Sequence, residues 1–297
     1  MARHNEVRLF GCIADIPEII KRNDTGELTR GSFHLATIKS ERDDGQNRQN
    51  AVYDWPIIIT YDGEMVRQMA SYKMYDVIEI KGTLTTKKYL KYSFCSVCGK
   101  MNAVEGTTVF INPIFMKKRN TENLTEKQAV QWIRENRDIS NSITVVGNIC
   151  NEVDYFHQGK IQTSVYQIAI DRKLYLKADD PANKTDFPIV RVYGKDAKQD
   201  SMCLHKGSCV LIDGYLHTRE FDRESICQDE NCGQTYTWKD NTTEIIPFEG
   251  GTEYLSNYTD PKTAAEKQAE SVVSDFFGHG FKTKEQSSEN SFGDTEE

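Results

Sequence analysis

Two pairs of cysteines have the residue type and spacing to hold a metal ion. Cys95 and Cys98 form a C-x2-C turn that ends in Gly99, and Cys227 and Cys232 form a looser C-x4-C pair. Such thiolates suit tetrahedral zinc, but a structural zinc normally takes four ligands and each pair supplies two. The spacing therefore predicts one zinc site shared by both pairs. Two incomplete sites, vestigial reduced pairs and C-x2-C disulfide chemistry are the alternatives.

A ribbon of alternating basic and aromatic residues leads into the first cysteine pair. It offers phosphate contacts and flat faces for base stacking in one segment, which is typical of single-strand binding. An ordinary solvated charged face is the alternative. The corresponding stretch of the second half, residues 213–222, has no basic excess, so the first half is expected to bind a polyanion more strongly. The ribbon consists of Lys81, Lys87, Lys88, Tyr89, Lys91, Tyr92 and Phe94.

These segments belong to an internal repeat. Residues 5–13 return as 141–149, residues 54–61 as 186–193, and residues 77–89 as 209–221, always 132 to 136 positions later. Matches in the same order at nearly the same offset indicate that the chain contains two copies of one domain. We expect the domains to span residues 1–120 and 141–260, joined by a linker at 121–140 and followed by a tail at 261–297.

Each copy has the pattern of a β domain. Phe33, Leu35 and Thr37 alternate with polar or small neighbours, which is the period of a half-buried strand. Apolar runs lead into Gly82 and Gly214, which mark a bulge or a sharp bend in a strand. With short helices near 63–71 and 194–202, this favours an all-β fold of two tandem OB-fold barrels over a β-sandwich.

The segments outside the barrels have helical and disordered signatures. Residues 125–137 are helical by composition and form a short linker helix, in which we expect Trp132 to pack against a barrel. A helix at 264–277 and then a disordered acidic C-terminal tail are expected after Pro261, because that composition cannot bury enough apolar surface.

Charge and hydropathy narrow the class of protein. The 297 residues carry a net charge of −8, but residues 1–120 are net +4 and residues 141–260 net −7. A basic front allows a polyanionic partner despite the acidic total. No apolar run approaches the roughly 20 residues that span a bilayer, and the opening residues lack the apolar core of a signal peptide. This disfavours membrane and secreted proteins, and a cytoplasmic location is expected. The cysteines are then expected to be reduced.

The ordered segments resemble the bacterial single-stranded DNA-binding protein family, here as a tandem duplication with a cysteine-pair insert in each copy. The opening N-x-V-x-L-x-G-x-I, residues 54–61 (D-W-P-I-I-I-T-Y) and the G-x-L-x-T-[RK]-x-aromatic pattern of residues 82–89 carry the resemblance. It covers residues 5–115 and 141–255. A Trp that is typical after the second strand is missing here, where residues 40–43 read S-E-R-D.

The resemblance implies a set of base-stacking aromatics and an assembly. The stacking positions are occupied in the first copy by Trp55, Tyr61 and Tyr89, and in the second by Phe187, Tyr193 and Phe221, near the basic Arg219. Burial of the strand-ending tyrosines in the core is the alternative. Family members generally assemble four barrels, which implies a homodimer here, and their acidic tails recruit replication and repair proteins. This chain lacks the apolar tip of such tails.

The leading hypothesis is therefore a non-enzymatic protein that binds and protects single-stranded DNA during replication, recombination or repair. An RNA-binding or replication-accessory OB-fold module is the alternative, because the fold serves many ligands. A zinc deaminase is disfavoured. Its H-x-E motif is matched by residues 4–6, but no P-C-x-x-C follows in the chain.

Overall fold

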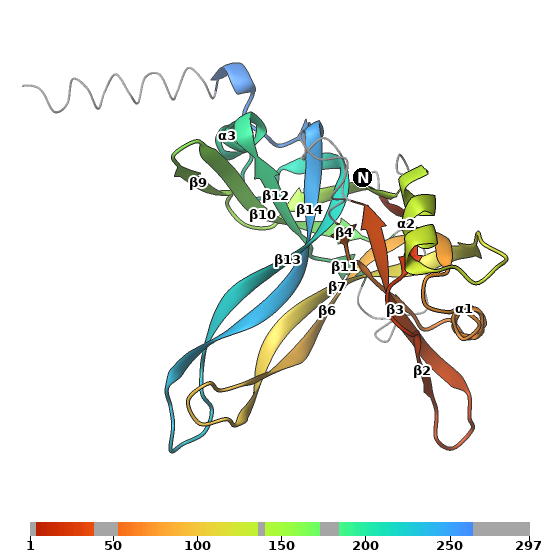
Figure 1. Cartoon of the computed structure of the whole chain (residues 1–297). Helices are drawn as coiled ribbons and strands as arrows, with labels where there is room; N and C mark the ends of the chain where they lie inside the picture. The colour runs from red at the N-terminus through yellow and green to blue at the C-terminus, as the bar shows by residue number, and fades with distance from the viewer. Residues whose placement is uncertain (1–3, 39–52, 136–139, 173–183, 264–297) are drawn as a thin grey trace, which may run out of the picture. The chain divides into compact units, whose positions relative to one another are not determined.

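The computed structural model describes residues 4–38, 53–135, 140–172 and 184–263 (Figure 1). Met1–Tyr258 form one compact unit that holds both repeats, and Thr259–Glu297 form a second. The expected helix at 264–277 and the expected disordered tail lie outside the described residues. Among the described helices, none has the length and apolar character needed to cross a bilayer. The domain boundaries at 120, 140 and 260 stay a prediction.

The first repeat folds into strands around a short helix. Its elements are β1 (Asn5–Ile13), β2 (Glu18–Lys21), β3 (Leu28–Ile38), β4 (Tyr53–Asp54), β5 (Ile57–Thr60), α1 (Gly63–Met69), β6 (Val77–Phe94) and β7 (Met101–Lys118).

The second repeat follows the same order after a linker helix, α2 (Glu126–Glu135). Its elements are β8 (Asn141–Ile149), β9 (Asp154–Gln158), β10 (Ile161–Asp171), β11 (Thr185–Asp186), β12 (Ile189–Tyr193), α3 (Gly194–Cys203), β13 (Cys209–Ile226) and β14 (Thr235–Ser256).

Each repeat closes into a small barrel. In the first, β1 pairs with β6, β6 with β7, β7 in parallel with β5, β5 with β3, and β3 with β1 again. In the second, β8, β13, β14, β12 and β10 close in the same way, with β12 parallel to β14. Five strands closed in this manner form an OB-type barrel. The predicted all-β fold of two tandem OB-fold barrels is confirmed.

The predicted strand periods and glycine bends are also found. Phe33 and Leu35 of β3 point into the core, as do Tyr166 and Ile168 of β10. The pairing register shifts at Gly82 and just before Gly214. A Cβ at these glycines would lie 2.6 Å from the carbonyl oxygen of residue 112 and 2.2 Å from that of residue 246, so only glycine allows the two backbones to approach.

A pseudo-twofold axis relates the barrels and passes through the pairing of β1 with β8. Val7 pairs with Ile143, which is its own equivalent in the second copy. Asn5 pairs with Val145, the equivalent of Leu9, and Leu9 pairs with Asn141, the equivalent of Asn5. This antiparallel contact joins both barrels into one continuous sheet.

The linker helix covers the outer side of the first barrel. α2 buries Ala129 and Ile133 against Phe10, Cys12 and Val77. The helical linker is confirmed, but the packing role expected for its tryptophan is wrong. Trp132 is exposed, because the residues facing the barrel are those one position later and three positions earlier in the helix.

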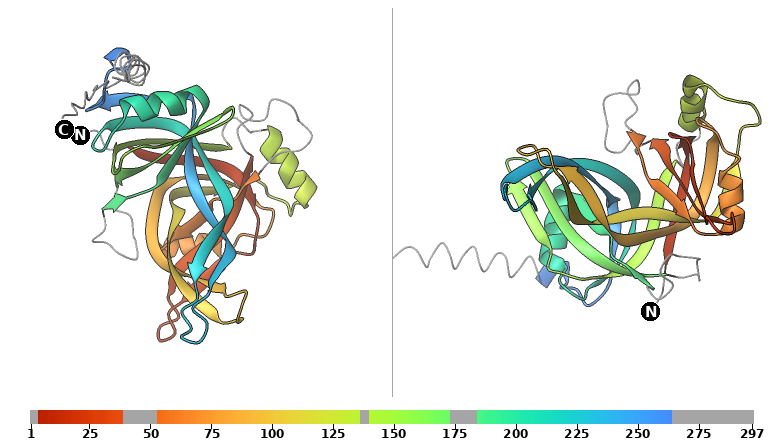
Figure 2. Two further views of the ribbon diagram at one scale, coloured as in Figure 1. Left: turned by 90° about the vertical axis from the view of Figure 1, so that its left-hand side faces the viewer. Right: turned by 90° about the horizontal axis from the view of Figure 1, so that it is seen from below.

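Two long β-hairpins extend from the barrels and lie side by side, as Figures 1 and 2 show. One is formed by β6 and β7, which pair without interruption from Gly82 to Phe94, and the other by β13 and β14. We call them the first hairpin (residues 83–112) and the second hairpin (residues 215–246). Their turns carry the two cysteine pairs.

Candidate nucleic-acid interface and cysteine cluster

The first barrel carries an apolar groove of about 360 Å³ on its outer surface, over β3, β5 and the base of the first hairpin. Three of the predicted nucleic-acid-binding residues meet in it: Lys87 and Tyr89 from β6, and Tyr61 directly after β5. The residues that form its apolar floor and its aromatic and basic walls include Ile57, Ile59, Phe110, Tyr61, Tyr89 and Lys87. Flat rings beside an ammonium group are suited to bases and phosphates of a single strand.

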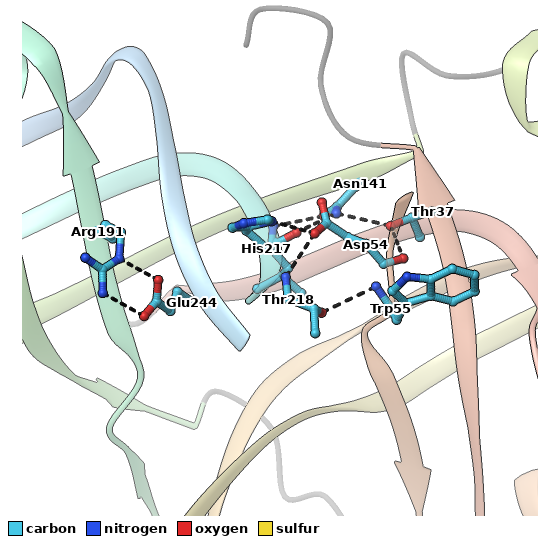
Figure 3. Close-up of polar contacts among 9 residues, drawn as sticks. Thr37, Asp54, Trp55, Asn141, Arg191, His217, Thr218 and Glu244 are labelled. Atoms are coloured by element: carbon cyan, nitrogen blue, oxygen red, sulfur yellow. Dashed lines mark hydrogen bonds and ion pairs between the residues drawn. The ribbon is translucent and has the colours of Figure 1, made fainter. Parts of the chain in front are cut away.

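The corresponding surface of the second barrel is filled by an ion cluster. At the equivalents of Ile59 and Phe110 stand Arg191 and Glu244, and Arg191 binds Glu244 through two hydrogen bonds of 2.6 and 3.0 Å. Arg219 adds a third contact to the same carboxylate at 3.2 Å. Figure 3 shows the pair of Arg191 and Glu244. The apolar floor of the first groove is therefore replaced by buried charge.

Glu244 remains ionised in this cluster. Its burial would raise the pKa of the carboxyl group, but the hydrogen bonds and positive charges of Arg191 and then Arg219 outweigh burial and hold the pKa below its usual range. Arg219 also stands over the ring of Phe221, 4.9 Å from its centroid. One face of the ring predicted to stack on a base is thus occupied by a guanidinium group.

Trp55 is positioned by the opposite barrel. Its backbone N–H donates a hydrogen bond of 3.3 Å to the hydroxyl of Thr218, at the base of the second hairpin, as Figure 3 shows. The preceding Asp54 is fully buried and accepts hydrogen bonds from the backbone N–H of Thr218 at 2.9 Å and from the His217 ring at 2.7 Å. Trp55 itself is exposed, so its ring lies at the seam between the barrels.

The second barrel repeats this contact in the reverse direction. The backbone N–H of Phe187 donates to the hydroxyl of Thr86 at 3.0 Å, and Asp186 accepts from the backbone N–H of Thr86 at 2.7 Å. Asp186 also binds Arg172 through two hydrogen bonds of 2.8 Å. Phe187 is exposed at the seam, and Tyr193 is exposed at the end of β12.

The predicted lysines lie on different surfaces. Lys87 lines the groove, and Lys88 is exposed on the opposite face of β6. Lys81 lies beyond the bulge on the outer side of the sheet, in a cavity with Arg8 and Phe115. The side chain of Lys91 is only 10% exposed and pairs with Asp240 of the second hairpin, so its ammonium group serves the contact between hairpins.

Further polar contacts join the hairpins along their length. Lys91 donates to the carbonyl oxygen of Asn241 at 2.7 Å, and Arg223, its equivalent, donates to the carbonyl oxygen of Glu105 at 2.8 Å. The hydroxyls of Ser93 and Tyr236 are 2.7 Å apart. The two hairpins therefore form a single arm, with one face of each turned inward.

At the end of the arm the four cysteines come together. Their sulfur atoms all lie within 4.8 Å of one another. The contacts cross between the copies, with Cys95 Sγ 3.9 Å from Cys232 Sγ and Cys98 Sγ 3.6 Å from Cys227 Sγ. The structure thus unites the four residues predicted to form a shared metal site.

The geometry of this cysteine cluster fits a metal centre better than disulfides. Zinc–sulfur bonds of about 2.3 Å in a tetrahedron place sulfurs about 3.8 Å apart, close to both crossed distances. All eight cysteines are free thiols. The backbone N–H of Cys98 donates to the Cys95 sulfur and is the largest cause that lowers the pKa of that thiol to about 7. The backbone N–H of Lys100 donates to the Cys98 sulfur, but desolvation and the neighbouring thiols outweigh this hydrogen bond and raise the pKa of Cys98 to about 12.

A sequence model of the single-strand binding protein family matches residues 140–232, the stretch from the start of β8 into the cysteine turn of the second hairpin. This segment, most of the second barrel, is similar to the single-strand binding protein family. For the second copy this agrees with the resemblance drawn from the ordered sequence segments.

Two solved structures of single-stranded DNA binding proteins are similar in fold to this chain over both barrels. The wild-type single-stranded DNA binding protein from Thermus aquaticus is similar with a TM-score of 0.55 and 14% identity, covering 86% of this chain and 95% of that chain. A deletion mutant of the Thermus aquaticus protein is similar with a TM-score of 0.53 and 16% identity, covering 88% of this chain and 100% of that chain.

Sequence reasoning missed two features of the site. The apolar floor of the groove was not recognised, although Ile57 and Ile59 alternate with core residues between the two predicted aromatics. The ion cluster of the second barrel was also missed. Its signal is present in the repeat, where Ile59 is replaced by Arg191.

Proposed function

We propose that the protein binds single-stranded DNA with little sequence preference, by stacking bases on exposed aromatic rings and pairing phosphates with lysines. The groove of the first barrel is the observation that carries the proposal, because it joins Tyr61, Tyr89 and Lys87 on an apolar floor. Base stacking contributes about 1–3 kcal/mol per base and is tolerant of sequence. Trp55 and Phe187 at the seam extend the set of rings from one barrel to the other.

We assign the stronger binding to the first barrel. Its groove offers apolar surface that is free to receive a base, whereas Arg219 covers one face of Phe221 in the second barrel. The second barrel retains an exposed Tyr193 and Phe187 for weaker contacts. Protection of single strands in replication, recombination or repair follows from such binding.

We propose that the cysteine cluster holds one structural zinc ion shared by the two copies. The chemistry of the donors supports this, since four thiolates are a common closed zinc set. The ion would hold the tips of the hairpins together and leaves no open position for catalysis. Reduced thiolates persist in the cytoplasm, where we propose that the protein acts.

We further propose a homodimer, which would place four barrels on one strand. A twofold contact is the commonest way for identical chains to associate. Replication or repair proteins are proposed as partners of the C-terminal segment, whose residues lie outside the described part of the chain.

Titration with oligothymidylates of increasing length, followed by intrinsic tryptophan fluorescence, tests the function. We expect quenching, tighter binding with length up to a plateau, and weaker binding as salt rises, because neutralised phosphates release counterions. A Trp55→Phe variant assigns the quenching, since Trp132 and Trp238 remain in it.

RNA oligonucleotides of equal length provide the comparison with the alternative ligand. Tighter binding of RNA than of DNA would favour an RNA-binding module. Absence of binding to single-stranded DNA at low salt would contradict the proposed function itself.

A further inference from the structure

The two faces that the hairpin arm turns to solvent differ in chemistry. Side chains alternate between faces along a strand, and residues paired across a hairpin share a face. On the first hairpin the inward face contains Lys91, Ser93 and Cys95. The outward face therefore carries the intervening residues of β6. These are Lys88, Leu90, Tyr92 and Phe94.

This outward row is apolar, aromatic and open to solvent. The relative exposure is 62% for Tyr92 and 68% for Phe94, and Leu90 is also exposed. Met101, which pairs with Phe94 across the hairpin, is exposed as well. Large exposed apolar side chains gathered in one place usually mark a binding surface.

The fold itself does not require these residues. The pseudo-twofold places the same row on the outward face of β13, where the equivalents of Lys88, Leu90 and Tyr92 are all acidic. The second hairpin tolerates these charges on the same backbone, so packing gives no reason for the rings. The equivalent residues in the second copy are Glu220, Asp222, Glu224 and Ile226.

Net charge follows the same division. Residues 87–108 of the first hairpin contain four lysines and one glutamate, whereas residues 219–240 of the second contain three basic and six acidic residues. Lys91 and Lys100 are paired with Asp240 and Asp229 of the second hairpin, so the difference that solvent meets lies on the outward faces. There Lys88 and Glu105 balance on the first hairpin, whereas three acidic residues outnumber Lys239 on the second, so the second side repels a polyanion more strongly.

We propose that the outward row of the first hairpin is a second contact surface for single-stranded DNA, and that the strand follows this side of the arm only. Tyr92 and Phe94 would stack bases and Lys88 would meet the backbone, while the acidic row of the second hairpin turns the strand away. This inference rests on the proposed function and adds the path that the bound strand takes along the molecule.

The width of the row favours a strand of DNA over a second copy of the chain. On β7 the residues opposite Tyr92 and Leu90 are Ala103 and Glu105, so the apolar surface is about one strand wide. A stable protein interface needs about 800 Å² from each partner, with an apolar centre. Separate flat rings beside a lysine match bases taken one at a time.

The pseudo-twofold supplies a matched pair of variants for the test. Tyr92→Ala with Phe94→Ala removes the rings, and Glu224→Ala with Ile226→Ala changes the equivalent positions of the second hairpin. Both pairs are exposed, so both variants keep the inward contacts of the arm. Affinity is measured by anisotropy for labelled oligothymidylates of graded length, with zinc content as a check on the arm.

We expect the Tyr92/Phe94 variant to bind short oligonucleotides, which fill only the groove, like wild type. For oligonucleotides long enough to reach the arm, its affinity should fall at least about fivefold, the change that the loss of one base stack of about 1 kcal/mol produces. The Glu224/Ile226 variant should keep or slightly improve the affinity at every length. Wild-type affinity of the Tyr92/Phe94 variant at all lengths, or equal losses in both variants, would overturn the inference.

A second measurement uses the wild-type protein and does not depend on the variants folding. Photocrosslinking to oligonucleotides containing 5-iodouracil should give adducts on Tyr92 or Phe94 and none on the outward residues Asp222, Glu224 and Ile226. Adducts confined to the groove would overturn the inference and leave the proposed function intact. If light scattering shows a larger assembly in wild type than in the Tyr92/Phe94 variant, the row binds another copy of the chain. Failure of the wild type to bind any oligonucleotide would instead contradict the proposed function.

Discussion

Asp54 of the first barrel accepts a hydrogen bond of 2.9 Å from the backbone N–H of Thr218 in the second. The equivalent carboxylate in the second barrel, Asp186, accepts a hydrogen bond of 2.7 Å from the backbone N–H of Thr86 in the first. Both aspartates are fully buried, and each directly precedes an exposed seam aromatic. The contact between barrels and the presentation of these rings thus depend on the same residues.

Replacing either aspartate by alanine should destabilise the unit, but to different extents. Asp54→Ala leaves the buried N–H of Thr218 without this acceptor, at a cost of about 1–3 kcal/mol in the free energy of unfolding. Asp186→Ala also deprives Arg172, whose side chain is 11% exposed, of its carboxylate, and should cost about 3–5 kcal/mol. Urea denaturation of both variants measures the difference. A larger loss for Asp54→Ala would contradict the assigned roles.

The two grooves should differ when their rings are removed. Tyr61→Ala with Tyr89→Ala should weaken binding of single-stranded DNA by at least about 2 kcal/mol, because each lost stack costs about 1–3 kcal/mol. Tyr193→Ala with Phe221→Ala is the matched variant and should cost less than about 1 kcal/mol, because the Arg219 guanidinium already covers one ring. Fluorescence titration at fixed salt compares them, and equal losses would rule out the asymmetry.

Purified protein should contain about one zinc ion per chain. Cys95→Ser and Cys227→Ser, from different copies, should each abolish zinc binding, because the four sulfurs form one cluster. Elemental analysis gives the stoichiometry, and faster amide exchange at the hairpin tips should accompany the loss. Cys150→Ser lies outside the cluster and should retain the metal. Two zinc ions per chain would contradict a shared site.

The free energy of unfolding should depend on pH, because the carboxyl group of Asp200 in α3 is buried. Burial is the largest cause that raises its pKa to about 6, despite hydrogen bonds from Tyr254 at 2.6 Å and Tyr166 at 3.0 Å. Because the folded state holds this proton more tightly than the unfolded state, the resulting stability is present below about pH 4 and is lost as pH rises through about 6.

The Asp200→Asn variant isolates this effect. Between pH 4 and pH 7.5 the wild type should lose about 2 kcal/mol of unfolding free energy relative to the variant, because most of the two-unit pKa shift falls within this range. Urea denaturation at pH 4 and at pH 7.5 measures this loss. The exposed Asp213→Asn serves as the control. Parallel pH profiles for wild type and Asp200→Asn would show that Asp200 does not titrate in this range.

In solution the protein should be a homodimer. Light scattering at micromolar concentration should give a mass near twice the 34.0 kDa of the chain. A mass near one chain, unchanged as concentration rises, would mean that the pairing of β1 with β8 already satisfies the surface through which such barrels associate.

Four features could be predicted from the amino-acid sequence: the repeat, the β character of both copies, the bends at Gly82 and Gly214, and the two cysteine pairs. These are local features, since strand period, glycine in a strand and cysteine spacing are visible within a few residues. Equal offsets between the copies also predicted that the pairs occupy equivalent places, from which a shared cluster followed.

The side of each hairpin that meets its partner could not be predicted in this way, because it depends on pairing between distant segments. Lys91 and Tyr92 are neighbours in one basic and aromatic ribbon, yet Lys91 is committed to Asp240 and Tyr92 faces solvent. A shift of one residue would exchange them, because side chains alternate along a strand and the register is set by pairing with distant residues. The same holds for Glu244, whose buried charge is tolerated because Arg191 and Arg219 reach it from other strands. Such contacts join residues far apart in the chain, and no local pattern specifies them.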